Sequence, residues 1–294
     1  MQKRKPSSTF TKIISYTLLG ILILFISARL LLNTFFNERL ILSLSKKVAD
    51  ESKGHYHLFI DELTINLIAN SITINNIIIS PNLLLHNPKT SYLFKASSLS
   101  LLHISILDYI NNHALNIGSI EFEKSEISIY NGAQSIENKF KLSNLFSKKI
   151  KSISIENIHI NNAAFTIYKN KIDTTILFKS YNNSLYLKNI QLNAETIKKN
   201  SLGAIEQIEL TMNAFAYQIQ NGLYTLHGKK LVVSSIDSVL TIDSIKLIPN
   251  YSKELFHKIV GGQTTRLTAT ASSIKMQQLD MQSFLETNTL EIKK

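Results

Sequence analysis

The chain has 294 residues, 44% of them hydrophobic and 18% charged, which allows a sizeable core and argues against disorder. Its formal charge of +11 and pI near 9.5 would suit nucleic acid or an anionic membrane surface, but we find no arginine cluster, aromatic platform or zinc finger and expect no nucleic-acid partner. The absence of cysteine excludes disulfides and thiolate metal sites.

The N-terminal region has the pattern of a membrane anchor. A short basic tail, residues 1–12, precedes the apolar run Ile13–Leu32. Twenty helical residues span about 30 Å, the thickness of the hydrocarbon core of a bilayer. A cleaved signal peptide with a site near Ser27-Ala28 is the alternative, but apolar residues resume directly after that site. We therefore expect a transmembrane helix over 13–32, with the N-terminus in the cytoplasm and the bulk of the chain outside it.

Two regions follow the expected anchor. Residues 33–55 keep a helical spacing of apolar residues and are interpreted as a helical juxtamembrane linker, which either prolongs the anchor or lies at the membrane interface. From Tyr56 onward apolar and polar residues alternate, so residues 56–294 are expected to form one strand-rich domain. The expected strands are 56–67, 71–80, 94–106, 174–179, 184–192, 205–215, 217–227, 230–234, 238–247 and 265–276.

Short helices and turns are expected between these strands. The helix candidates are 106–111, 142–150, 279–285 and 250–260, the last capped by Asn250 and ended by Gly261-Gly262. With only 9 Gly and 4 Pro in the chain, asparagine must serve many turns, because it tolerates the left-handed region. The pairs placed where turns would be useful are Asn75-Asn76, Asn111-Asn112, Asn161-Asn162 and Asn182-Asn183.

Two stretches of the chain are copies of one β-unit. They are Ala114–Gly132 and Lys151–Asn170, and they align when Tyr130 is set against Tyr168. The other matched apolar pairs are Leu115 with Ile153, Ile117 with Ile155, Ile120 with Ile158, Phe122 with Ile160, Ile127 with Phe165, and Ile129 with Ile167. In both copies the alternation slips by an odd step at two places, which a β-bulge or short turn must absorb.

The repeat predicts the fold class: a mainly β chain in which a twisted, repetitive antiparallel sheet forms an open groove, with a few short helices. A plain sandwich or barrel is the alternative, since any antiparallel β-protein gives such alternation. The strands carry more large apolar residues than a sheet with one wet face needs. We take eight of them as candidates for a lipid-binding groove: Ile72, Ile74, Ile117, Ile120, Phe122, Ile155, Ile158 and Ile160.

No catalytic pattern is found. The eight histidines include one close pair, His55 and His57, without a further ligand to complete a metal site. No G-x-S-x-G motif, phosphate loop or dinucleotide fingerprint occurs. Asp237 and Asp243 are interpreted as solvated charges rather than paired carboxylates in a pocket. We expect no enzymatic activity, no cofactor and no metal.

The order of these elements resembles the AsmA-like envelope proteins, the AsmA/TamB/YhdP group. The likeness lies in Ile60–Pro81, in Leu99–Tyr130, where a strand, a helical turn and two strands follow one another, and in Thr264–Glu286. The resemblance implies an anchor in the inner membrane, a β-domain in the periplasm, and a groove with an apolar floor that moves phospholipid toward the outer membrane. Phospholipid or another lipid, the inner membrane and other envelope proteins are then the implied partners.

Three functions remain open at this point. The first is a membrane-anchored groove that binds or conducts lipid in phospholipid transport or outer-membrane maintenance. The second is a non-catalytic scaffolding protein of the envelope, with a closed β-core and a surface that binds another protein. The third is a binder of nucleic acid or an anionic surface on the cytoplasmic side. An exposed, contiguous apolar surface would favour lipid or partner binding over a closed core.

Overall fold

The computed structural model describes residues 37–82, 90–132, 150–199, 205–262 and 265–280. The helices are α2 (Asn37–Glu51), α3 (Ile106–Asn112), α4 (Ala194–Lys199) and α5 (Lys253–Val260). The strands are β1 (Tyr56–Asn66), β2 (Ser71–Pro81), β3 (Ser91–Ile104), β4 (Ala114–Glu123), β5 (Glu126–Tyr130), β6 (Ser152–Tyr168), β7 (Ile176–Asn193), β8 (Ile205–Ile219), β9 (Tyr224–Ser234), β10 (Val239–Pro249) and β11 (Ala269–Gln277). The expectation of a mainly β chain with few helices is confirmed.

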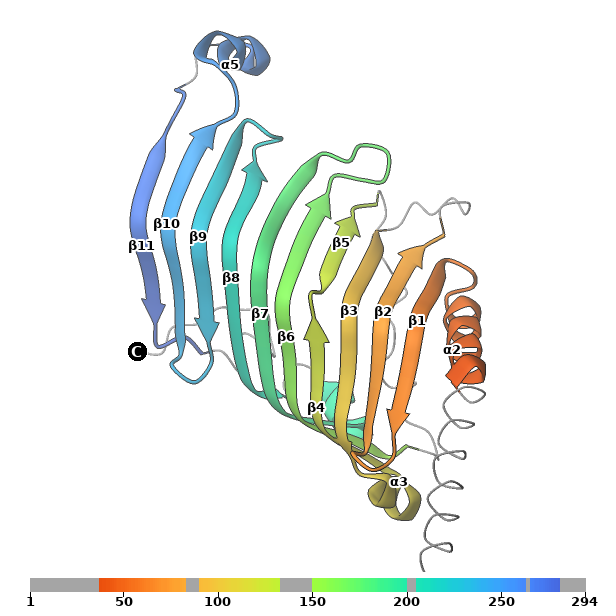
Figure 1. Cartoon of the computed structure of the whole chain (residues 1–294). Coiled ribbons are helices and arrows are strands. Elements are labelled where there is room, and N and C mark those ends of the chain that lie inside the picture. Colours follow the sequence, from red (N-terminus) through yellow and green to blue (C-terminus); the bar gives the residue numbers. More distant parts are fainter. Residues whose placement is uncertain (1–36, 83–89, 133–149, 200–204, 263–264, 281–294) are drawn as a thin grey trace, which may run out of the picture.

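All eleven strands form one sheet, shown in Figure 1, in the order β1-β2-β3-β4-β6-β7-β8-β9-β10-β11. The short strand β5 continues the line of β4, since both lie between β3 and β6. Most neighbouring strands are consecutive in the chain and antiparallel, as alternating apolar and polar residues in tightly connected strands predict. Within the described ranges β1 and β11 each pair with one strand, so the sheet is open at both edges.

The two copies of the repeat lie side by side and run parallel, so the expectation of an antiparallel arrangement is wrong at this place. β4 and β5 pair with β6 in the register of the sequence alignment: Leu115 faces Ile153, and Tyr130 faces Tyr168. Each copy thus places its apolar residues beside their equivalents. A parallel pair needs a crossover connection. That connection contains residues 133–149, which lie outside the described residues together with most of the helix expected at 142–150.

A line of left-handed residues crosses the sheet at one level. They are Asn76, Lys124, Asn162, Asn182, Ala214 and Ser244, with φ between 48° and 53°. Between β1 and β2, for example, the pairing runs from Ile60–Ile77 to Glu62–Asn75 and skips Asp61 and Asn76. This skip absorbs the odd step between Ile74 and Ile77, so both side chains enter the same buried cluster. The register of β6 against β7 shifts between Ile160 and Phe165, so the bulge predicted for that step of the second copy is confirmed.

Several predicted boundaries are wrong for related reasons. Asn76, Asn162 and Asn182 take the left-handed conformation inside strands rather than at turns. The two strands expected at 174–179 and 184–192 are one strand, β7. The turn after β8 lies at 220–223, where Gln220, Asn221 and Gly222 have positive φ, rather than at residue 216. The helix at 106–111 is confirmed as α3, and α4 was not predicted.

The cap of α5 is also corrected. Ser252, not Asn250, accepts a hydrogen bond from the backbone N–H of Leu255 and begins the helix. Asn250 instead accepts from the Thr225 hydroxyl and donates to the carbonyl of Gly222, which ties the β8–β9 turn to the end of β10. Gly261 ends α5 in the left-handed conformation, as expected.

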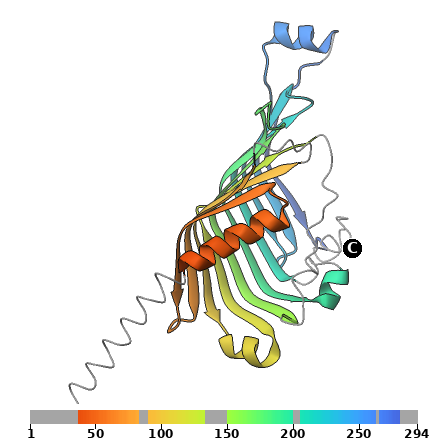
Figure 2. The same cartoon turned by 90° about the vertical axis from the view of Figure 1, so that its right-hand side faces the viewer.

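Helix α2 lies within the expected 33–55 linker, at Asn37–Glu51, and runs along the β1 edge of the sheet (Figures 1 and 2). Its Leu40, Ile41 and Leu44 pack on the buried cluster of β1–β3. Figure 2 shows that the lower strand ends bend away from the face seen in Figure 1, so the hidden face is concave. No helix among the described residues is long and apolar enough to cross a membrane, and the expected tail and span at 1–32 lie outside them.

Candidate functional site

One row of apolar side chains crosses the whole sheet. Every strand except the short β5 contributes one residue to it. Each residue is the direct pairing partner of the next, from β1 to β11. The row is Leu63, Ile74, Leu99, Phe122, Ile160, Leu185, Leu210, Val233, Leu240 and Met276. With neighbouring strands about 4.8 Å apart, nine steps give a row about 43 Å long. We call the side of the sheet that carries this row the apolar face.

A second and a third row lie beside it on the same face. The second is Ile65, Ile72, Leu101, Ile120, Ile158, Leu187 and Ile208, again joined by direct pairing. The third is Ile104, Ile117, Ile155, Ile190 and Ile205, and its buried members pack against Ile120 and Ile158 of the second row. All eight groove candidates from the sequence therefore lie in three adjacent rows of one face: Ile74, Phe122 and Ile160 in the first, Ile72, Ile120 and Ile158 in the second, Ile117 and Ile155 in the third.

Burial along the first row falls from the β1 edge toward the β11 edge. Leu63 and Ile74 are 2% and 8% exposed, because the cluster under α2 encloses them. The middle of the first row, from Leu99 to Leu240, is half-buried. At the far edge Met276 is 36% exposed and Ile274 39%. Ile74 is thus a packed core residue, whereas Ile158 and Ile160 keep some of their surface accessible.

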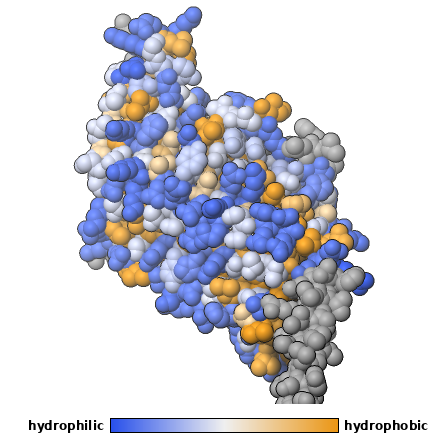
Figure 3. Space-filling view, in the orientation of Figure 1, coloured by the Kyte–Doolittle hydropathy of each residue, from blue (hydrophilic) through white to orange (hydrophobic). Residues whose placement is uncertain are grey.

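Charged groups are kept to the opposite face. The row next to the first apolar row along β1–β6 is Glu62, Asn75, Ser98, Glu123 and Asn161. Neighbours in this row bond across the strands, as in the 3.0 Å bond from Asn75 to Glu62 and the 2.8 Å bond from Asn161 to Glu123. Figure 3 shows the face turned to the viewer of Figure 1, and hydrophilic residues predominate on it. The three apolar rows contain no ionisable side chain.

Aromatic rings extend the apolar face above the line of left-handed residues. The rings of Phe94 and Phe122 meet edge-on, with centroids 5.9 Å apart. The centroid of the Phe178 ring lies 5.7 Å from that of Phe165 and 6.4 Å from that of Phe215. The Phe215 ring lies over Gly228 of β9, where a Cβ would come within 2.1 Å of the ring. Glycine is required there by this close approach rather than by its backbone conformation. Phe122 is among the groove candidates predicted from the sequence, whereas Phe94, Phe165, Phe178 and Phe215 are not.

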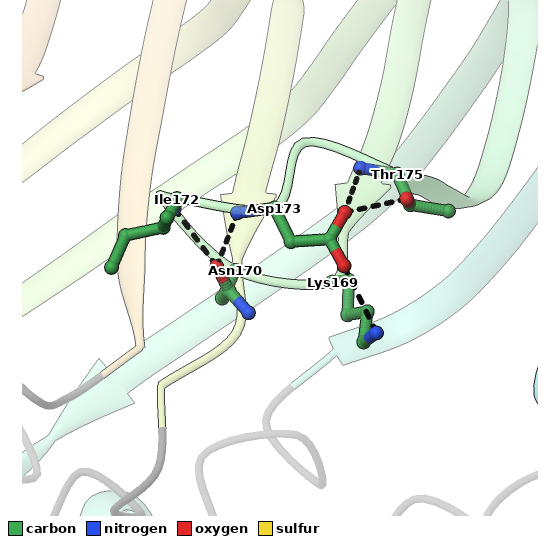
Figure 4. A network of polar contacts seen from close by, with 5 residues as sticks. All are labelled: Lys169, Asn170, Ile172, Asp173 and Thr175. Carbon is green, nitrogen blue, oxygen red and sulfur yellow. Dashed lines mark hydrogen bonds and ion pairs between the residues drawn. The ribbon is translucent and has the colours of Figure 1, made fainter.

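A network of polar contacts closes the β6–β7 loop (Figure 4). In the β6–β7 loop, Asn170 Oδ1 accepts from the N–H groups of Ile172 and Asp173, at 2.8 and 2.6 Å (Figure 4). Asp173 accepts from the hydroxyl and N–H of Thr175 and pairs with Lys169 at 2.9 Å. The Thr175 hydroxyl bond, the Lys169 contact and the Thr175 N–H bond together lower the pKa of the Asp173 carboxyl to about 2. This network closes a surface turn.

The remaining candidate polar residues do not converge. Asp237 bonds Ser234 in the β9–β10 turn, and Asp243 accepts from Ser273 of β11. His55 precedes β1 and His57 lies exposed within it. Within the part of the chain that the structure describes, no group of three or more potential ligands could hold a metal ion. Within the described residues, the fold and its surface define a single-layer β-sheet protein with three adjacent apolar rows on one face.

Comparison with known proteins identified no relative of this chain. No family model matches the chain, and no curated protein matches its sequence.

Proposed function

We propose that this protein binds lipid acyl chains along the apolar face, which serves as the floor of an open groove. The observation that supports the proposal is the unbroken row from Leu63 to Met276, which no charge or polar side chain interrupts over about 43 Å. A sandwich would cover such a row with a second sheet. Among the described residues the strands belong to one sheet, and the middle and far side chains of this row are half-buried or exposed.

The energetics suit a long apolar ligand. Each methylene that leaves water gains about 0.8 kcal/mol, and this gain needs no directional contact. An acyl chain therefore needs no polar contact with the floor of the groove, and the three apolar rows supply none. The rows run across the strands, so a chain lying along them contacts one side chain of every strand in turn.

The envelope setting is part of the same proposal. The Ile13–Leu32 run would anchor the chain in the inner membrane, with the sheet in the periplasm. The resemblance to AsmA-like proteins then makes phospholipid transport or outer-membrane maintenance the process served. In this proposal the protein is not an enzyme, and its partners are phospholipid, the inner membrane and other envelope proteins.

The test compares neighbouring residues on opposite faces of β6. A photo-crosslinking amino acid at Ile158, on the apolar face, should capture phospholipid in cells, and one at His159, on the polar face, should not. Ile158→Asp should reduce lipid captured by a crosslinker at Leu187, its pairing partner. His159→Asp is the matched control and should leave that capture unchanged.

Two results would count against lipid binding. Equal lipid capture at Ile158 and His159 would mean unspecific contact with the membrane. Capture of protein alone at Ile158 would favour the scaffolding function, in which the apolar face binds a polypeptide of the envelope. Thermal unfolding of the Ile158→Asp variant in detergent separates loss of binding from loss of fold.

A further inference from the structure

Five exposed aliphatic side chains gather at one end of the sheet. Leu67 and Ile68, in the β1–β2 turn, are 61% and 74% exposed. Ile106, Leu107 and Ile110 of α3 are 44%, 71% and 63% exposed. We call these five residues the rim patch. Single exposed apolar residues are common on proteins, but a contiguous group marks a surface that contacts a partner or a membrane.

Two hydrogen bonds hold these elements at the same end. The carbonyl of Asn70 in the turn accepts from the N–H of Ile104 at 2.9 Å, two residues before α3 begins. Ser105 caps α3 and donates its own N–H to the carbonyl of Asn116 in β4. In Figure 3 hydrophobic residues gather at the lower end of the molecule, where α3 and the β1–β2 turn lie in Figure 1.

The chain leads toward the expected anchor at this same end. α2 runs opposite to β1: Ser52 near its C-terminal end bonds Tyr56, at the start of β1, and Ser45 bonds Leu58. Asn37 therefore lies at the end of α2 that points toward the β1–β2 turn. Four residues, 33–36, separate Asn37 from the Ile13–Leu32 run, and such a connection reaches at most about 17 Å.

The composition of the rim patch suits hydrocarbon rather than a charged surface. Asp108 is the one charged residue among 67–70 and 106–112. Its carboxylate accepts from Asn116 at 2.9 Å, and bonds from Ser105 and Asn116 lower its pKa. The exposed apolar residues of α5, at the opposite end of the sheet, stand instead among Lys253, His257 and Lys258. The five aliphatic side chains gain by leaving water for acyl chains, whereas the charged Asp108 carboxylate gains nothing and stays at the headgroup level.

We propose that the rim patch inserts into the bilayer that holds residues 13–32. The insertion sets the lower ends of β1–β4 at the lipid surface, so that an acyl chain passes from the bilayer to the apolar face without crossing water. This inference rests on the proposed function, because it takes the Ile13–Leu32 run as the anchor. It adds a second membrane contact and an orientation of the sheet.

The chain contains no tryptophan, so a single introduced tryptophan reports its own surroundings. The full chain is reconstituted in vesicles of phosphatidylethanolamine and phosphatidylglycerol whose acyl chains carry bromine, which quenches tryptophan fluorescence. Leu107→Trp and Ile68→Trp should be quenched severalfold more than Ile172→Trp. Ile172 is the matched control, an isoleucine 97% exposed in the β6–β7 loop, away from the rim patch. Ile21→Trp, within the expected span, tests the anchor by itself.

The outcomes separate the two proposals. Quenching at Leu107→Trp and Ile68→Trp that is strongest with bromine at shallow acyl positions supports insertion of the rim patch. Quenching at Ile21→Trp alone overturns the rim patch and leaves the anchored groove standing. No quenching at any of these positions overturns both the anchor and the insertion. A blue-shifted, unquenched signal at Leu107→Trp that grows with protein concentration means that the patch binds a second copy, which also overturns the inference.

Discussion

Tyr130 and Tyr168 stack face to face, with ring centroids 4.9 Å apart and an interplanar angle of 9°. They are the last matched apolar pair of the two repeat copies, and they pair in parallel at the ends of β5 and β6. The similarity between the copies thus has a direct structural counterpart, because equivalent residues are in contact. Partial burial raises the pKa of the Tyr130 hydroxyl, and Tyr168 beside it adds to this effect.

This stack predicts a measurable coupling. In a double-mutant cycle with Tyr130→Leu and Tyr168→Leu, the double variant should lose less stability than the sum of the single variants. The expected coupling is about 0.5–1.5 kcal/mol, the usual value for an aromatic pair beyond its buried area. Denaturant unfolding of the detergent-solubilised full chain measures it. Additive losses would show that the rings are neighbours without an interaction.

Gly228 and Phe215 give a second prediction. A Cβ at residue 228 would overlap the Phe215 ring, which is itself 7% exposed and packed beside Phe178. Gly228→Ala should therefore cost about 1–3 kcal/mol, as overpacked sites do. Gly262→Ala is the control, since nothing lies within 4 Å of its added Cβ. If both variants unfold at the same denaturant concentration, the close approach of the ring to β9 is refuted.

The uneven burial of the first apolar row predicts an uneven response to truncation. Ile74→Ala should cost about 2–5 kcal/mol, because its site under α2 is a packed core. Met276→Ala, at the exposed end of the row, should change stability by about 0.5 kcal/mol or less. The free energies of unfolding of both variants are compared with that of the unchanged chain. Equal losses would mean that the whole row is core, and the lipid-binding proposal would lose its support.

Much of the fold follows from alternation in the sequence. The strands, the β-bulges at odd steps, α3 and the shared face of the eight candidate residues all come from the spacing of apolar residues, because one face of the sheet must exclude water. The alignment of the two copies also predicted the register in which they pair. It did not predict the relative direction of the two strands, since a repeat aligns equally well whether its copies run parallel or antiparallel.

The rest depends on contacts that local patterns do not encode. Asn162 and Asn182 belong to asparagine pairs that the sequence places at turns, and both do take the left-handed conformation. It occurs inside strands because the neighbouring strands are bent at the same level. Burial could not be read either: Ile74 and Ile158 look alike in sequence, but Ile74 belongs to the buried cluster on which α2 packs, and Ile158 lies beside another cluster. The rows across β7–β11 were missed because no internal repeat drew attention to them.

The Asp173 network predicts a pH dependence confined to the β6–β7 loop. The Thr175 hydroxyl bond and the Lys169 contact lower the folded-state pKa of Asp173 to about 2, from an ordinary value of 3.8. A lowered pKa means that the carboxylate form is favoured in the folded loop, so this contribution is present above about pH 4 and is lost as pH falls toward 2. Hydrogen exchange of the Thr175 amide should accelerate over that range, beyond its intrinsic pH dependence. Asp173→Asn should remove the transition, and a transition that persists would have to come from another group.

Ala214 allows a test of the line of left-handed residues, because an alanine-to-glycine change should affect stability in opposite directions inside and outside that line. It is an exposed residue of β8 with φ of 48°, a conformation that costs alanine about 1 kcal/mol and glycine nothing. Ala214→Gly should therefore leave stability unchanged or raise it by up to about 1 kcal/mol. Ala216→Gly, two residues along the same strand in ordinary β conformation, should lower it by about 0.5–1 kcal/mol, because glycine has more freedom to lose. Denaturant midpoints of the two variants are compared directly. If Ala214→Gly is as destabilising as Ala216→Gly, residue 214 is an ordinary strand residue, and the bend that keeps apolar side chains of β8 on one face has another origin.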